Sequence, residues 1–533
     1  MGRQSKNEIA AAESLRHGAV SGGDDVPAAF EPGKVAGPEG FDPAEVADAL
    51  QLFWKSGDGD NFYVRSKEGR WSRWTNTATV DLMRKYPGRL LAIKAREGEI
   101  LSEVKEVLLY VRQARVVDDV LPSLPGYWSG IHELDSGERV IVKNAPKLVE
   151  PTPGSWDNIR LLIEGRLDRS PTGGVNQTPW FHSWCKVAAE SIRKGQPGHW
   201  RAGHAMILAG PAGCGKNRLQ EQIITPLLGG YGRFADPAKF LFESDEFNGD
   251  VFAAEHLMLS EIPMPSQRTV DRTSLAEKIK QVVANPAQRM RLMRQEPCSV
   301  SPFWRLTISV NDDPDKLRSL PLITSDFGDK VLVFHCAAAP LPLIERDTLE
   351  SQRLFRETMQ AELPHYLHWL LNEFQIPEEL LSYPDGRPAT RFGFREYHAP
   401  CIKDELFEDT PAAHLMNLID SAEFGRIADD DDWMEDSPAK LKLWDLVGDR
   451  EVVDNFGQRL KVWWGRAETL QMLLTGEGGR TCNVATMAKK LFQHNKCSTL
   501  LGRLFADEHF ANIRVGKQNT MHWKGWQIVP PNA

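Results

Sequence analysis

The sequence predicts an α/β core with a mainly parallel sheet, preceded by a small α+β domain and followed by a helical tail that ends in a hairpin. Short apolar runs at 204–210, 256–261, 304–311 and 330–336 have the length of buried strands, and helical spacing separates them. Strands that alternate with helices indicate a parallel sheet. After about residue 345 the pattern is helical, so the chain leaves the sheet there.

Length and composition limit the class of protein. The 533 residues suggest roughly three to five domains. Hydrophobic residues make up 41% and charged residues 26%, which is typical of a globular protein and excludes a mostly disordered or collagen-like chain. No apolar run reaches about 18 residues and the first residues lack a signal-peptide core, so we expect a cytoplasmic protein without a membrane partner.

The cysteines indicate the redox compartment, whereas the net charge must be considered segment by segment. Seven scattered cysteines without a CxxC pair favour a reducing compartment and argue against structural zinc. The net charge of −9 hides two opposite segments. Residues 418–436 hold eight acids and one Arg, whereas 480–533 hold eight Lys or Arg and two acids. A basic tail therefore follows an acidic insert, and the negative net charge of the whole chain is only weak evidence against nucleic-acid binding.

Changes of character along the chain predict the domain organisation. Residues 62–71, FYVRSKEGRW, indicate a hairpin around Lys67–Gly69, and helical spacing follows it before a strand at 138–146. We expect five segments: a flexible arm (1–42), a small α+β domain (43–155), an α/β domain that carries the parallel sheet (156–345), a helical segment with the acidic insert (346–436) and a tail domain (437–533).

A glycine loop lies between the strand at 204–210 and a helix beginning near Asn217. It fits the phosphate-binding pattern G-x-x-x-x-G-K, and its strand-loop-helix context makes a chance glycine-rich turn the weaker interpretation. Backbone N–H groups and the helix N-terminus would hold phosphates, and Lys216 would reach the β and γ phosphates of ATP. The predicted nucleotide-binding residues are Gly210, Pro211, Ala212, Gly213, Cys214, Gly215, Lys216 and Asn217.

The loop departs from the usual pattern at its last position. Asn217 replaces the Ser or Thr whose hydroxyl normally holds Mg²⁺. An amide oxygen can also be a ligand for a hard cation, so we expect Asn217 and Glu261 as the magnesium ligands.

Two further polar residues follow apolar strands. Glu261 ends HLMLSE and would polarise the attacking water, unless it is simply a surface carboxylate. Asn311 ends LTISVN and would position the water and sense the γ phosphate, although Asn before DDPD also favours a turn. Ser260 stands where an acid often assists the metal.

These motifs, in this order, resemble those of superfamily 3 helicases, the AAA+ type ATPase modules of phage and plasmid primase-helicases. The resemblance rests on GPAGCGKN, LMLSEI and LTISVNDDPDKLRSLP and covers roughly 155–345. The Gly-Lys-Asn ending is similar to that in the helicase part of phage primase-polymerases. The family implies a ring, expected to be a hexamer, that hydrolyses ATP with Mg²⁺ and moves on single-stranded DNA.

The resemblance also implies basic residues for DNA and for the neighbouring active site. Basic positions between the two strand motifs match a DNA-tracking hairpin, with a solvated helix face as the plain alternative. These positions are Lys278, Lys280, Arg289, Arg291 and Arg294. Arg318 or Lys330 would supply the basic finger that acts on the ATP of the next subunit, and the sequence does not choose between them.

The end of the chain predicts a winged helix. Three helical segments between 466 and 508 precede two strands expected around Gly516–Asn519, which is a helix-turn-helix with a β wing. The net positive charge favours duplex DNA, and protein docking is the alternative. The predicted DNA contacts of this tail are Lys496, Arg503, Arg514, Lys517 and Lys524.

The sequence therefore predicts a replicative DNA helicase of a phage, plasmid or integrated element. The region before 155 shows no convincing acidic triad for polymerase activity, so a separate primase is an expected partner. A DNA-binding initiator or scaffold that binds ATP without efficient hydrolysis is the main alternative, because Asn217 and Ser260 each replace a residue that usually helps to bind magnesium. A P-loop small-molecule kinase is disfavoured by the Asn311 motif and the basic tail.

Overall fold

The computed structural model describes most of the chain after residue 41. The predicted arm, most of the acidic insert and Arg294 lie outside the described residues. The described ranges are 42–85, 103–168, 175–229, 234–242, 248–262, 269–292, 297–324, 326–344, 348–408, 410–425, 441–446, 451–453, 459–477, 480–506, 514–519 and 524–531.

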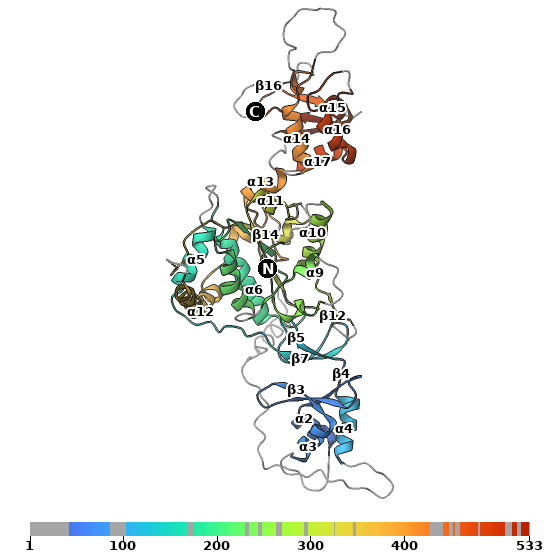
Figure 1. Ribbon diagram of the computed structural model, residues 1–533, viewed down its shortest axis with the longest axis vertical. Coiled ribbons are helices and arrows are strands. Elements are labelled where there is room, and N and C mark those ends of the chain that lie inside the picture. Colours follow the sequence, from blue (N-terminus) through green and yellow to red (C-terminus); the bar gives the residue numbers. More distant parts are fainter. Residues whose placement is uncertain are drawn as a thin grey trace, which may run out of the picture.

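The N-terminal unit is a four-stranded sheet covered on one face by helices (Figure 1). Its strand order is β3-β2-β1-β4, and the predicted hairpin is present, with Arg65 of β2 opposite Trp71 of β3. Phe62 and Val107 belong to the core between sheet and helices. The elements are α2 (Pro43–Ala49), β1 (Leu52–Lys55), β2 (Asn61–Arg65), β3 (Trp71–Thr75), α3 (Asn76–Arg84), α4 (Glu103–Ala114) and β4 (Val116–Val117).

A second sheet joins this unit to the rest of the molecule. Val120 and Ile141 pack on the first sheet, whereas Leu121 and Val142, on the opposite face, belong to the core of the central unit. The segment expected as one domain at 43–155 thus holds two sheets, and the second is packed on the central unit, a contact that periodicity did not indicate. Its strands, in the order β5-β7-β6, are β5 (Asp119–Ser123), β6 (Gly130–Glu133) and β7 (Arg139–Asn144).

The central unit is built on a parallel five-stranded sheet, as the alternating pattern predicts. All neighbouring strands are parallel, in the order β14-β8-β13-β10-β9. Strand β13 therefore lies between the strand that precedes the glycine loop and the strand that precedes Glu261. The strands are β8 (Ala205–Gly210), β9 (Phe234–Ala235), β10 (His256–Leu259), β13 (Arg305–Asn311) and β14 (Val331–His335).

Both faces of this sheet are covered. Ile207 and Ala209 of β8 face one core and Leu208 faces the other, so the strand is apolar at every position. Helices α5 (Asp157–Leu167), α6 (Thr178–Lys194) and α12 (Leu349–Asn372) contribute to the second core, whereas α10 (Thr269–Ala284), α13 (Pro400–Glu408) and the β5-β7-β6 sheet contribute to the first.

Shorter elements complete the central unit. The helix after the glycine loop contains a π-helical turn, η1, between α7 and α8, and β11 and β12 form the hairpin that the resemblance implies after α10. These elements are α7 (Lys216–Leu219), η1 (Gln220–Ile224), α8 (Thr225–Leu228), α9 (Ala238–Phe242), η2 (Val251–Ala253), β11 (Gln288–Met290), β12 (Cys298–Val300), α11 (Pro314–Leu317), η3 (Gly328–Lys330) and η4 (Glu378–Leu380).

The tail is a separate core of helices and a three-stranded sheet, at the end of the molecule opposite the N-terminal unit (Figure 1). The three predicted helices and the hairpin are present, but the hairpin loop was placed wrongly. Val515–Asn519 is strand and not turn, and Asn519 pairs with Lys524. A third strand pairs with β19, so the order is β17-β19-β18.

The tail also takes in residues that were expected in the preceding segment. Leu415 and Ile419 of α14 lie in the tail core, so this core extends to residues before 437. The elements are α14 (Pro411–Ser421), η5 (Leu443–Asp445), β15 (Glu451–Val453), β16 (Arg459–Lys461), β17 (Trp463–Gly465), α15 (Ala467–Thr475), α16 (Ala485–His494), α17 (Cys497–Ala506), β18 (Val515–Asn519) and β19 (Lys524–Ile528). None of the described helices is both long enough and apolar enough to pass through a membrane.

Candidate nucleotide site

The glycine loop turns tightly because three of its positions accept only glycine. A Cβ at Gly210 would lie 2.4 Å from the carbonyl oxygen of Cys336 on the neighbouring chain segment. Gly213 and Gly215 have φ angles of +75° and +98°, in the left-handed region that side chains disfavour. The helix then begins at Lys216, so its free N–H groups face the loop.

The Lys216 ammonium is folded onto the loop itself. Its Nζ donates to the carbonyl oxygens of Gly210 (2.7 Å) and Pro211 (2.9 Å) and to Oδ1 of Asn311 (3.2 Å). The side chain is buried. Within the described residues these partners are uncharged, so the ammonium group is held beside the loop without a carboxylate, which is a suitable arrangement for binding an anion.

The structure brings the loop, Glu261 and Asn311 together at one edge of the sheet. Asn311 of β13 pairs with Gly210 of β8, and Leu259 of β10 pairs with Ile308 of β13. Glu261 follows Leu259 by two residues, so this register places it near Val310, next to Asn311. Glu261 and Asn311 line a common cavity of about 580 Å³, the size of a small-molecule pocket, together with the loop residues Ala212, Gly213, Gly215 and Lys216. The predicted nucleotide-binding residues Gly210, Pro211 and Cys214 are not among its lining residues. Ser260 lines the same cavity.

Asn217 also lines the cavity, but its amide oxygen already has protein partners. Asn217 Oδ1 accepts a hydrogen bond from Ser309 Oγ at 3.1 Å and lies 3.4 Å from Gln220 Nε2. The predicted role as magnesium ligand would require this oxygen to give up one of these contacts. Glu261, in contrast, has an exposed carboxylate at the cavity.

Gln220 is the centre of a buried polar chain beneath the loop. Its Nε2 donates to Ser309 Oγ at 2.5 Å, and its Oε1 accepts from the hydroxyl of Thr307. Thr307 Oγ1 contacts His256 Nε2 at 2.8 Å, and His256 Nδ1 contacts Thr225 Oγ1 at 2.7 Å. Burial lowers the pKa of His256 to about 3, so the ring is neutral and has one donor and one acceptor.

Thr225 Oγ1 lies 3.0 Å from the carbonyl oxygen of Gln220 as well as 2.7 Å from His256 Nδ1, and its single proton serves one of the two at a time. With this proton directed at His256, the side chains form one chain in a single direction. Thr225 donates to His256, His256 donates to Thr307, and Thr307 donates to Gln220. Gln220 then donates to Ser309, which donates to Asn217. The chain thereby joins the last residue of the glycine loop to strands β10 and β13, which precede Glu261 and Asn311. It begins at Thr225, directly after the π-helical turn, which is a deviation often found at functional sites.

Sequence reasoning missed several residues of the cavity. Lys316 on α11 lines it five residues after Asn311, and this short spacing within the same motif was the available signal. Arg218, Leu341 and Ile344 also line it. The two apolar residues follow β14 in an irregular segment, and no local pattern marks them.

The two candidates for the basic finger lie at opposite ends of the sheet. Arg318 follows α11 on the edge that carries Asn311, and its exposed guanidinium pairs with Asp315 at 2.9 Å. Lys330 precedes β14 at the other edge, where its Nζ is bonded to Asp329 (2.5 Å) and to the carbonyl of Asp326 (2.8 Å). Only Arg318 is therefore both exposed and on the side of the glycine loop.

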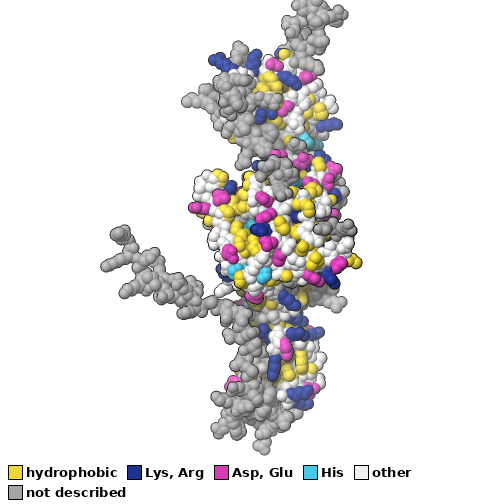
Figure 2. Space-filling view, turned by 90° about the vertical axis from the view of Figure 1, so that its left-hand side faces the viewer, with side chains coloured by type: hydrophobic (Ala, Val, Ile, Leu, Met, Phe, Trp, Pro, Cys, Tyr) yellow, Lys and Arg dark blue, Asp and Glu magenta, His cyan; other side chains and the backbone are white. Residues whose placement is uncertain are grey.

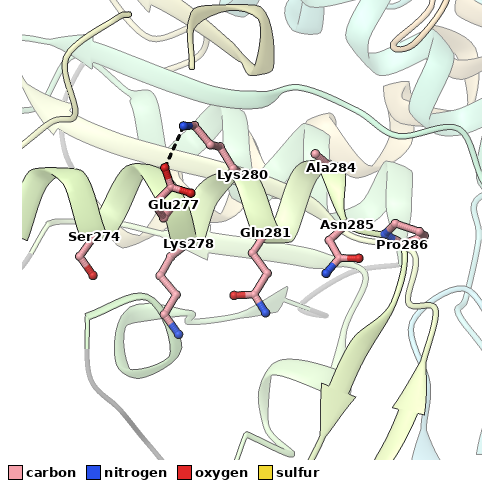
Figure 3. A pocket seen from close by; sticks show the side chains of 8 residues that line it. All are labelled: Ser274, Glu277, Lys278, Lys280, Gln281, Ala284, Asn285 and Pro286. Carbon is pink, nitrogen blue, oxygen red and sulfur yellow. Dashed lines mark hydrogen bonds and ion pairs between the residues drawn. The ribbon is translucent and has the colours of Figure 1, made fainter. Parts of the chain in front are cut away.

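The predicted DNA-binding residues of α10 are not equivalent. Ser274, Lys278, Gln281 and Asn285 point to one side of the helix, whereas Lys280 turns to the other side toward Glu277 (Figure 3). Lys280 Nζ is paired with both Glu277 (2.9 Å) and Asp326 (2.5 Å), and these pairs raise the pKa of Lys280. Lys278 Nζ lies 5.4 Å from the ring centre of Phe240.

The hairpin after α10 continues this basic surface. Arg289 on β11 and Arg291 just after it are exposed. Main-chain groups of both bond to the side chain of Asn248, which holds the loop end of β11 (2.9 and 2.7 Å). Arg294 falls outside the described residues, in the connection between the two strands.

The predicted DNA contacts of the tail also divide into exposed and structural residues. Lys496 and Arg503 are exposed at α17, and Lys517 is exposed on β18. Arg514 is instead bound to Asp420 of α14 at 2.5 Å and to the carbonyl of Val529, so it stabilises the tail core. Lys524 begins β19, and the orientation of its side chain is not described. Figure 2 shows Lys and Arg side chains over the tail and the N-terminal unit.

Comparisons with known proteins find similarity only at the level of solved structures. No protein-family model and no curated protein matches the chain. An apo structure of the NrS-1 C-terminal region matches with 12% identity and a TM-score of 0.47, covering 92% of this chain and 100% of that chain. A second apo structure of that region, the A form, matches with 12% identity and a TM-score of 0.44, covering 71% and 78%.

Two structures whose titles name helicases also match. The SCCmec type IV Cch active helicase is 11% identical, with a TM-score of 0.28 and coverage of 58% of both chains. The JC virus helicase is 11% identical, with a TM-score of 0.23, covering 41% of this chain and 61% of that one. At TM-scores below 0.5 the superpositions are loose, so the function of this chain is inferred from its own residues.

Proposed function

We propose that the chain is an ATP-dependent DNA helicase of the superfamily 3 type. One observation carries the proposal: Lys216, Glu261 and Asn311, which come from three separate parts of the sequence, line a single cavity at the edge of a parallel sheet. A chance glycine turn, a surface carboxylate and a turn-forming asparagine would have no reason to meet there. The carboxyl edge of such a sheet is also where α/β proteins usually bind ligands.

The residues of the cavity suit a nucleoside triphosphate. The loop N–H groups would bind the phosphate oxygens, and Lys216 would move from the carbonyls of Gly210 and Pro211 to the terminal phosphates. Leu341 and Ile344 provide the apolar part of the wall. A cavity of about 580 Å³ with an ammonium group and exposed loop amides therefore fits ATP in size and charge.

Hydrolysis requires a positioned water at the terminal phosphate. Glu261 would accept hydrogen bonding from this water and make it more nucleophilic, and Asn311 would orient it through its amide. Magnesium would neutralise phosphate charge when bound. Glu261 is the residue best placed to hold the metal, with phosphate and water oxygens as the remaining ligands. Arg318 of an adjacent copy would contact the phosphates from outside the cavity.

The DNA-binding part of the proposal rests on two basic surfaces. Lys278, Arg289 and Arg291 lie on α10 and the following hairpin, and a ring of copies would present them repeatedly to single-stranded DNA. The tail, with Lys496, Arg503 and Lys517, would bind duplex DNA. We further propose a hexameric ring and a separate primase as partner.

DNA-stimulated ATP hydrolysis by the full chain tests the proposal. We expect Lys216→Ala to lose nucleotide binding and Glu261→Gln to keep binding but lose turnover. Glu378→Gln changes an exposed carboxylate on η4, outside the cavity, and should behave like the wild type. Electron microscopy with a non-hydrolysable ATP analogue and single-stranded DNA should show closed rings. Persistent monomers under these conditions would exclude a ring that translocates on DNA.

A second candidate function is a DNA-binding initiator or scaffold that binds ATP without efficient hydrolysis. The observation that favours it is the engaged amide oxygen of Asn217 together with Ser260 in place of an acid, because both reduce the protein ligands available to magnesium. Tight ATP binding without turnover, in the presence of DNA and magnesium, would select this candidate.

A further inference from the structure

A buried arginine lies behind the glycine loop, and no motif in the sequence marks it. Arg166 is on α5, about fifty residues before Lys216, and its exposed fraction is 0%. A guanidinium is charged at any physiological pH. Placing such a charge in the interior is unfavourable unless other groups compensate it.

The partners of Arg166 are carbonyl oxygens from three chain segments. Its Nε donates to Cys214 of the glycine loop at 3.0 Å, and its Nη2 donates to Ala339 at 3.0 Å. Its Nη1 reaches the carbonyls of Pro340 (3.3 Å) and Leu162 (3.5 Å). Within the described residues none of its hydrogen-bond partners is a carboxylate. Burial accordingly lowers the pKa of Arg166.

The bond to Cys214 has a direct consequence for the loop. The peptide group between Cys214 and Gly215 is trans and planar, so its carbonyl and its N–H point in opposite directions. Arg166 holds the carbonyl, and the N–H of Gly215 is therefore directed away from Arg166. Gly215 lines the cavity, so an N–H directed away from Arg166 is placed to donate to phosphates bound there.

Arg166 also ties the loop to another wall of the cavity. It bonds to residues 339 and 340, and the next residue, Leu341, lines the cavity. A Cβ at Gly215 would come within 3.0 Å of Arg166 Nε and 3.3 Å of Leu341 Cδ2, which shows how closely the three residues pack. The spacing of the loop and this wall thus depends on one side chain.

We propose that Arg166 is a positioning residue of the nucleotide site, which aims the Gly215 N–H at the phosphates and places a buried positive charge behind them. The inference rests on the proposed ATP site and deepens it. An anion in the loop would supply the compensating charge that the protein interior lacks. Because the guanidinium is shielded from solvent, its attraction for phosphates should be screened little by salt.

Binding of ATP, ADP and AMP to the full chain, measured by isothermal titration calorimetry, tests this role. Arg166→Gln removes the positive charge and keeps an amide donor. Arg166→Lys keeps the charge but loses the several fixed N–H donors of the guanidinium. We expect the Gln variant to bind ATP and ADP at least about tenfold more weakly, with a smaller loss for AMP. The Lys variant should recover part of the affinity.

Arg305 provides a matched control. It is also buried, its guanidinium donates to the main-chain carbonyls of Trp304 and Arg201 at 2.9 Å, and it begins β13 at the end opposite Asn311. Arg305→Gln should lower stability without changing nucleotide affinity. Equal loss of affinity in both Gln variants, or none in Arg166→Gln, would refute the role of Arg166. Unchanged binding in Lys216→Ala would instead refute the nucleotide site itself.

Discussion

Gln220→Leu should uncouple the glycine loop from the two strands that carry the other site residues. The leucine side chain is similar in size and cannot form hydrogen bonds. Gln220 is fully buried and takes part in contacts with Ser309, Asn217 and Thr307. At about 1 kcal/mol for each of three hydrogen bonds, the free energy of unfolding of the central unit should fall by about 3 kcal/mol. Partners left unsatisfied in the interior would increase this loss.

The same substitution should affect catalysis more than binding. Loss of the Gln220 contacts leaves Ser309 and Asn217 at the cavity with only their hydrogen bond to each other, and Ser309 is two residues before Asn311. We therefore expect the turnover number for ATP to fall at least about tenfold, with a smaller change in KM, because the main phosphate contacts of the loop remain. Denaturant unfolding and steady-state ATP hydrolysis measure the two effects separately.

Gln281→Leu is the control for stability. It makes the same chemical change at an exposed position of α10, where effects within about 0.5 kcal/mol are usual. If Gln220→Leu were as stable and as active as this control, the polar chain would have no role in holding the site together. If Gln220→Leu lowered stability but left ATP turnover normal, the buried network of polar side chains would have only a structural role.

Three further outcomes are expected. Asn217→Ala should leave the magnesium dependence of ATP turnover unchanged in a magnesium titration, because the amide oxygen is bonded to protein groups; a several-fold higher magnesium requirement would identify it as a ligand. Lys278→Ala should weaken single-stranded DNA binding and reduce its salt slope by about one, whereas Lys280→Ala should change both little, because two carboxylates already hold Lys280. Burial lowers the pKa of His204 to about 3, below the unfolded value near 6.5, so this neutral ring stabilises the fold above pH 6.5 and the contribution is lost as the pH falls toward 3. His204→Phe should therefore make denaturant stability less sensitive to acid between pH 7 and 5, and an unchanged pH slope would contradict this.

The sequence alone determined much of the secondary structure of the central unit and the chemistry-bearing positions. β8 is apolar at every position and β14 at all but its last, as expected for parallel strands covered on both faces. β10 and β13 are equally buried, but they also carry His256, Thr307 and Ser309, which take part in the buried polar chain. The glycine loop could be predicted from the sequence for a similarly local reason. Gly213 and Gly215 adopt positive φ angles that other residues avoid, so the turn requires glycine at these positions. Glu261 and Asn311 stand out because a polar residue follows an apolar run.

Only the tertiary structure decided how these local pieces combine. The order of the strands places β13 beside the glycine-loop strand, and no periodicity within a strand encodes its neighbours. The roles of Arg166 and Gln220 likewise depend on partners far away in the chain, and a charged or amide side chain on a helix is ordinarily expected on the surface. Short strands and connections such as β9 and the turn between β18 and β19 were missed or misplaced because pairing, and not local composition, defines their ends. Hydrogen bonds and packing between segments that are distant in the sequence therefore determined the strand order and the partners of Arg166 and Gln220, which the local pattern of residue types does not encode.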